Sequence, residues 1–340
     1  MSIGKKVKIA LLIKLSIIVL FIFSIVGVDL YLHHHLGKQS GWNYRGYRGK
    51  VLGSKEKDEI RIACFGSSST LGYGLIVELT WPYYLERLLL NNNVRVSVAN
   101  LAANTQGIIG VLHDAQNYLS LDYDVALIHL GESEGPVGLN NTDVRQSDFF
   151  FRLFGYRPIL QAYLFEKAKI LKYGVNNLEN AYMGRTNDAL AQKERPLLFK
   201  IGASIEHLNK LIAETDKRLN KYENEAKKMQ SNKQEPYADF LFALKKTFDW
   251  LLDHNKKVFY FSEPYLYDST QQKLVRSLIE KEYKGKNVFY LDVTRNLDNV
   301  KKDYVYDGSH YNEKGNFIIA STLKEKLMEA IPGLRFQERK

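Results

Sequence analysis

A cluster of serines follows the first predicted strand of the chain. Residues 60–65 form an apolar, β-branched run, and Gly66-Ser67-Ser68-Ser69-Thr70-Leu71-Gly72 comes directly after it. Open parallel sheets bind ligands at the carboxyl ends of their strands, and glycines allow a tight turn that exposes a hydroxyl beside backbone N–H groups. The segment therefore fits a nucleophilic serine. Taken alone, it also fits a helix cap or a phosphate-binding loop.

Two nucleotide-binding motifs are excluded. No G-x-x-x-x-G-K-[ST] sequence occurs in the chain, and Gly72-Tyr73-Gly74 lacks the third glycine of a dinucleotide fingerprint.

A nucleophilic serine needs a base to take its proton and an acid to orient that base. Near the C-terminus, Asp307 precedes His310 by three residues. On one turn of chain, this spacing lets the carboxylate reach Nδ1–H of the imidazole while Nε2 points toward the serine. The order along the chain is serine, aspartate, histidine.

These motifs resemble the SGNH/GDSL hydrolase superfamily over most of residues 41–330. The block G-D-S-x-[ST]-x-G is similar to residues 66–72, which places the nucleophile at Ser68. The D-x-x-H block matches Asp307 and His310, including the following His-x-Asn-x-x-Gly-Asn run. Asn43-Tyr44-Arg45-Gly46-Tyr47-Arg48-Gly49 is similar to an N-terminal segment of secreted, often membrane-anchored, bacterial members. The resemblance implies an α/β fold and a serine esterase that needs no metal or organic cofactor.

The two middle blocks of the family depart from its pattern. A glycine N–H normally contributes to the oxyanion hole where this chain has Ala102, and an alanine N–H remains a donor. The asparagine of G-x-N-D is replaced by Ser133 within Gly131-Glu132-Ser133-Glu134. Losing one oxyanion donor typically costs about 10²–10³ in rate. The enzyme is then slow, uses Asn104 or a water instead, or is inactive.

The elements that position these residues alternate between strands and helices, which favours a parallel sheet covered on both faces. The expected fold is a flavodoxin-like three-layer α/β/α arrangement with a five-stranded parallel sheet. The strands are expected at 60–65, 95–100, 124–129, 257–262 and 288–291, and the helices at 81–91, 107–119, 271–283 and 314–331. An insertion at about 135–250 separates the third and fourth strands. Within it, the apolar stripe of 204–229 predicts a core-facing helix.

The positive charge of the chain is concentrated near its start. The net charge is +10, and the first 50 residues hold eight Lys or Arg against one acid, a surplus of seven that leaves three for the other 290 residues. A nucleic-acid partner is therefore not expected. The single Cys64 excludes an internal disulfide and a cysteine zinc site.

Residues 9–28 are apolar except for Lys14, Ser16 and Ser24, and as a helix they span about 30 Å of hydrocarbon. Lys5, Lys6 and Lys8 favour a cytoplasmic N-terminus. We expect an uncleaved single-pass anchor with an extracytoplasmic domain; a cleaved secretory signal is the alternative. The residues after the anchor, including Asp29 and the histidines 33–35, have the composition of a solvated stalk.

The expected organisation is a cytoplasmic stub and anchor at 1–36, a juxtamembrane linker at 37–58 and the hydrolase-like domain at 59–332. The expected activity is hydrolysis of esters of carbohydrates or lipids through Ser68, Asp307 and His310, with Ala102, Ser133 and Asn104 near the oxyanion. Two further classes stay open. One is an O-acyltransferase or a catalytically degenerate component of an envelope polysaccharide system. The other is a non-enzymatic membrane-surface scaffold based on the aromatic and basic residues of 146–175.

Overall fold

The structure is a computed structural model that describes residues 3–40, 43–92, 94–104, 106–130, 149–174, 188–219, 237–261, 269–293, 301–305 and 310–334. The chain forms two compact units. One comprises Met1–Gln39 and Pro158–Ile212, and the other comprises Ser40–Arg157 and Ala213–Lys340.

The second unit is built on a parallel sheet. Its strands are β1 (Ile60–Gly66), β2 (Val96–Asn100), β3 (Val125–His129), β4 (Lys257–Phe261) and β5 (Val288–Tyr290). They lie in the order β2-β1-β3-β4-β5, which confirms the flavodoxin-like arrangement. Each end of each strand lies within one residue of the position expected from the sequence.

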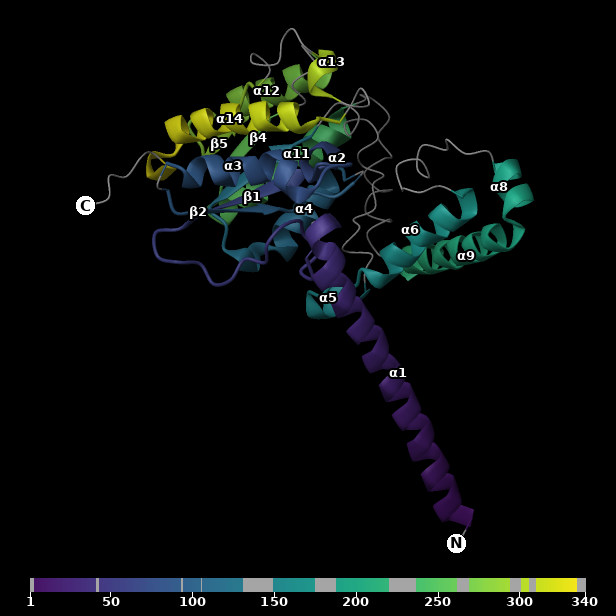
Figure 1. Cartoon of the computed structure of the whole chain (residues 1–340). Coiled ribbons are helices and arrows are strands. Elements are labelled where there is room, and N and C mark those ends of the chain that lie inside the picture. Colours follow the sequence, from purple (N-terminus) through teal and green to yellow (C-terminus); the bar gives the residue numbers. More distant parts are fainter. Residues whose placement is uncertain are drawn as a thin grey trace. The chain divides into compact units, whose positions relative to one another are not determined.

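Helices cover both faces of this sheet (Figure 1). Side chains alternate along β1, so Ile62 and Cys64 pack on one face while Ala63 and Phe65 pack on the other. The first face is covered by α3 (Trp81–Leu90) and α14 (Glu313–Ala330), and the second by α4 (Ile108–Asn117), α11 (Ala238–Asp253) and α12 (Thr270–Glu282). The short helices of this unit are α2 (Ser68–Leu71), η1 (Val77–Leu79), η2 (Leu119–Leu121), α5 (Phe149–Phe154), α13 (Lys301–Tyr304) and η6 (Pro332–Leu334).

The segment before β1 belongs to this core. Tyr47 is fully buried and Arg48 is 5% exposed, although the sequence suggested a linker at 37–58. The hydroxyl of Tyr47 accepts a hydrogen bond from the Leu52 N–H at 2.7 Å, and the Arg48 N–H donates to the Asn100 carbonyl at 2.9 Å. Residues 47–48 therefore close over the end of β2.

The first unit contains α1 (Ile3–Ser40), α6 (Leu160–Tyr173), α8 (Asp188–Glu194) and α9 (Pro196–Leu219). Among the described helices, α1 is the one long and apolar enough to cross a membrane, over Leu11–His35 with a mean hydropathy of 2.8. A signal sequence near the N-terminus can also meet these criteria of length and hydropathy.

Asp29 of α1 does not lie in a solvated stalk, as its sequence position suggested. Its side chain is buried, and Oδ1 accepts hydrogen bonds from the N–H groups of Ile159 and Leu160 at 2.8 and 2.6 Å. The imidazole of His33 lies 3.6 Å from the other carboxylate oxygen. The stalk interpretation is wrong here because Asp29 satisfies unpaired N–H groups at the start of α6, far away in sequence.

The prediction of a core-facing helix at 204–229 is also wrong. The helix α9 begins earlier, at Pro196, and Leu208 and Leu211 are 60% and 48% exposed. Residues 220–229 lie outside the described part of the chain. An apolar stripe shows which residues share a side of a helix, but it does not show what covers that side.

Candidate active site

The serine cluster forms a tight turn between β1 and α2. Ser67 is the extended N-cap residue of α2 and Ser68 is its first residue, just beyond the carboxyl end of β1, the second strand of the sheet. A Cβ atom at Gly66 would collide with Thr70 and with the carbonyl oxygen of His129. The chain can make this turn because residue 66 has no side chain.

The structure brings Ser68 and His310 together. Nε2 of His310 lies 2.9 Å from Oγ of Ser68, and both side chains are partly buried. The ring of Tyr73 lies over the imidazole, with the ring centroids 5.0 Å apart. A hydroxyl within hydrogen-bond reach of an imidazole is the arrangement that nucleophilic catalysis by serine requires.

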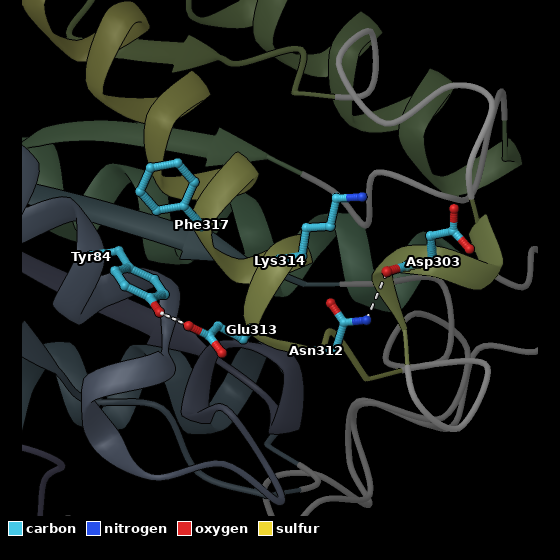
Figure 2. A pocket seen from close by; sticks show the side chains of 6 residues that line it. All are labelled: Tyr84, Asp303, Asn312, Glu313, Lys314 and Phe317. Carbon is cyan, nitrogen blue, oxygen red and sulfur yellow. Dashed lines mark hydrogen bonds between the residues drawn. The ribbon is translucent and has the colours of Figure 1, made fainter.

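The residues after His310 fix its place at the start of α14. Asn312 is the N-cap residue: Oδ1 accepts from the Gly315 N–H at 3.0 Å, and Nδ2 donates to the Asp303 carbonyl at 2.8 Å (Figure 2). A Cβ at Gly315 would collide with the carbonyl oxygen of Tyr304. The motif that identified His310 therefore also anchors the backbone that carries it.

Buried Asn316 connects this segment to the start of α3. Its Nδ2 donates to the carbonyl oxygens of Tyr311 and Asn312, both at 3.0 Å, and its Oδ1 accepts from the Trp81 N–H at 2.9 Å. All three bonds go to backbone groups. One amide side chain thus joins the backbone that follows His310 to the start of α3.

Figure 2 shows a surface pocket at the same helix start. The phenol of Tyr84 donates to Glu313 at 3.2 Å, and the ring of Phe317 meets that of Tyr84 edge-on. Burial and the neighbouring Glu313 carboxylate raise the pKa of Tyr84 to about 12, so the phenol stays protonated at neutral pH. The pocket is lined by Tyr84, Asp303, Asn312, Glu313, Lys314 and Phe317.

Arg48 and Asn100 hold the other side of the serine turn. The guanidinium of Arg48 donates to the carbonyl oxygens of Leu71, Gly72 and Leu75, the first two at 2.5 and 2.8 Å. Nδ2 of Asn100 donates to the Thr70 carbonyl at 3.0 Å. Burial lowers the pKa of Arg48 to about 10, against the opposing effect of Glu78, so the group is still charged at neutral pH. Sequence reasoning did not assign Arg48 a role.

Thr70 links this turn to β3. Its Oγ1 lies 2.9 Å from Nδ1 of His129, a buried residue whose ring stacks on Phe261 with the centroids 4.4 Å apart. His129 was also not identified from the sequence, because a histidine at the end of an apolar strand belongs to no recognisable motif.

The expected oxyanion residues lie in different places. The N–H of Ala102 is buried and lies 3.3 Å from Oδ1 of Asn100, while Asn104 is exposed. Ser133 and Asp307 lie outside the described residues. In the part of the chain that the structure describes, no three His, Cys, Asp or Glu side chains form a group suited to a metal ion.

Residues 62–323 match the family model of the GDSL-like lipase/acylhydrolases. Among curated proteins, none is similar enough to count as a match. Solved structures of similar proteins include a family 3 carbohydrate esterase of Clostridium thermocellum, with 12% identity and a TM-score of 0.43 over 81% of this chain and 98% of that one. A lipolytic protein of the G-D-S-L family from Veillonella parvula has 12% identity and a TM-score of 0.41 over 80% and 98% of the two chains.

Proposed function

Because the chain belongs to the GDSL-like lipase/acylhydrolase family, whose members hydrolyse ester bonds, we propose that it cleaves acyl esters of carbohydrates or lipids with Ser68 as its nucleophile. The observation that carries the proposal is the 2.9 Å distance between Nε2 of His310 and Oγ of Ser68. Ser68 also stands at the carboxyl end of β1, where parallel sheets bind their ligands.

The reaction proceeds in two steps. Oγ of Ser68 attacks the ester carbonyl as His310 takes its proton, and the same proton then passes to the leaving alkoxide, which departs as an alcohol. Water next attacks the acyl-enzyme, giving its proton to His310, and the free acid leaves as Ser68 regains a proton. Asp307 is the candidate for orienting the imidazole, as the resemblance to the family implies.

Developing negative charge on the ester oxygen requires donors near Ser68. The backbone N–H groups of Ser68 and Ala102 are the candidates, with Asn104 and Ser133 as further donors. The Oδ1 of Asn100 lies 3.3 Å from the Ala102 nitrogen, so this oxygen competes with the substrate for that N–H.

We further propose that α1 anchors the enzyme in a membrane, with the N-terminus in the cytoplasm and the hydrolase domain outside. The apolar side chains of α1 support this: Leu11, Phe21 and Phe23 are 69%, 65% and 70% exposed. No described part of the protein covers these side chains. A bilayer would surround them with acyl chains and remove their apolar area from water.

Labelling of the detergent-solubilised full chain with a fluorophosphonate probe tests the active site without knowledge of the substrate. We expect labelling of the wild type and of the Ser69→Ala control, and none of Ser68→Ala. His310→Ala should label far more slowly because the serine loses its base. A folded wild type that does not react, or a Ser68→Ala variant that still does, would refute the assignment.

A further inference from the structure

A stripe of apolar side chains lies exposed along α9. It consists of residues separated by four, seven and three positions, which share one side of a helix with 3.6 residues per turn. The stripe is Leu197 (69% exposed), Ile201 (41%), Leu208 (60%) and Leu211 (48%). Solvent-exposed apolar area of this extent on one side of a helix marks an interaction surface.

The opposite side of α9 already has a partner, the helix α6. Gly202 approaches so closely that a Cβ there would collide with the carbonyl oxygen of Ala168. Lys172 of α6 pairs with Glu206 of α9 at 3.3 Å, and both side chains are largely buried. The apolar stripe therefore faces away from its own hairpin.

Asp29 fixes where this hairpin meets α1. Its carboxylate binds the first N–H groups of α6, and it directly follows the apolar run 9–28. The hairpin thus begins just after the apolar run 9–28, within the last two turns of the candidate span Leu11–His35. Within this unit, α6 and α9 run crosswise to α1, and α9 lies on the side of α6 nearer the N-terminal part of α1 (Figure 1).

The charges around the stripe suit a lipid surface. Lys193, Arg195 and Lys200 are exposed around the N-terminal end of the stripe, and Glu194 is the exposed acid among them. Long basic side chains reach the headgroup region while the helix beside them buries its apolar side, and anionic lipids add attraction.

We propose that α9 lies in the surface of the bilayer that α1 spans, with this apolar stripe inserted at the boundary between headgroups and acyl chains. The inference rests on the proposed anchoring by α1. It goes further by giving the chain a second, interfacial attachment, in which the apolar side enters the boundary by about 5–10 Å.

Site-directed fluorescence on the full chain in vesicles tests the proposal. An environment-sensitive nitrobenzoxadiazole label is placed on Leu208→Cys, on the matched control Lys210→Cys from the polar side of α9, and on Val19→Cys within the apolar run. Each is made in a Cys64→Ala background. Vesicles of phosphatidylcholine with phosphatidylglycerol carry a doxyl-labelled lipid as a membrane quencher, and iodide serves as the aqueous quencher.

We expect the doxyl lipid to quench the label at position 208, and iodide to quench it several-fold less than the label at 210. Equal iodide access at both positions would overturn the proposal. So would protection of position 208 from both quenchers, because protein would then cover the stripe. Lipid quenching at position 19 without quenching at 208 would refute only the surface attachment, whereas absence of lipid quenching at 19 would refute the anchor itself.

Discussion

Nη1 of Arg48 lies 2.8 Å from the carbonyl oxygen of Gly72, the residue that ends the short helix begun by Ser68. Gly72 has a φ of 76°, in the left-handed region that closes helices. The same guanidinium binds the carbonyls of Leu71 and Leu75. One buried cation therefore fixes the far end of the turn that presents the proposed nucleophile.

We expect Arg48→Lys to lower both stability and activity. An ammonium group cannot reproduce the planar fork that binds three carbonyl oxygens, and each buried carbonyl left unpaired costs about 1–3 kcal/mol. The free energy of unfolding should fall by roughly 2–4 kcal/mol, and kcat should fall more than KM changes because Ser68 is held less firmly. Urea denaturation and ester hydrolysis measure the two effects. The exposed Arg45→Lys is the control, and equal behaviour of the two variants would contradict this role.

The fold was accessible to sequence reasoning because its signals are local. Strands buried on both faces read as continuous apolar runs, so β1 and β3 were located within one residue. The pairing of Ser68 with His310 was predictable from a motif at each end of the chain, not from any local pattern. The structure adds the distance between them.

Contacts between distant segments that no motif marks were not predictable. Asp29 is polar and follows an apolar run, which indicates a solvated end, yet it binds backbone groups 130 positions later. Arg48 was noted only as part of a resemblance, because nothing in its neighbours reveals which carbonyls it reaches. A sequence pattern shows which side of a helix or strand is apolar. The partners of Asp29 and Arg48 depend instead on how distant segments pack together in three dimensions.

Gly66→Ala should be strongly destabilising. Its Cβ would meet the carbonyl oxygen of His129, a backbone atom of the neighbouring strand that cannot move aside without breaking the sheet. We expect a loss of about 3 kcal/mol or more, or failure to fold. Gly53→Ala is the matched control, since nothing lies within 4 Å of a Cβ there. Thermal unfolding of the two variants measures this loss. A Gly66→Ala variant as stable as Gly53→Ala would contradict the close approach of residue 66 to the His129 carbonyl.

Glu59 should make stability depend on acid pH. Burial alone would raise its pKa, but hydrogen bonds from Arg61, Ser97 and the Glu56 N–H outweigh it and lower the pKa to about 2. A carboxyl whose pKa is lower in the folded state than in the unfolded state stabilises the protein at pH values above its unfolded-state pKa, here 4.5. That stabilisation is lost as the pH falls toward 2.

Glu59→Gln should therefore lower the free energy of unfolding by about 1–3 kcal/mol at pH 7, the range for hydrogen bonds to charged groups. The difference from the wild type should shrink between pH 5 and 2. Glu59 precedes β1 whereas Ser68 follows it, so ester hydrolysis should be unchanged at neutral pH. Denaturation at several pH values, with the exposed Glu325→Gln as control, measures this. A difference that does not vary with pH would show that charge on Glu59 contributes nothing.

Asn316→Asp replaces the side-chain amide nitrogen by an oxygen, and it should weaken the hydrogen bonds that hold the backbone after His310. An aspartate oxygen still accepts from the Trp81 N–H, but the second oxygen cannot donate to the carbonyls of Tyr311 and Asn312. Because the site is buried, an ionised carboxylate facing two carbonyl oxygens should cost about 2–4 kcal/mol at pH 7. Mild acid should restore part of that loss, since a protonated carboxyl donates one hydrogen bond.

Activity should fall together with stability in this variant, because Tyr311 directly follows His310. Urea denaturation at pH 7 and pH 5, with ester hydrolysis at pH 7, gives both readouts. Ser321→Ala on the same helix serves as the control: it removes only a bond to the Phe317 carbonyl at the surface and should shift stability by less than about 0.5 kcal/mol. If Asn316→Asp matched this control in stability and rate, the amide would not be what holds the start of α14 against α3.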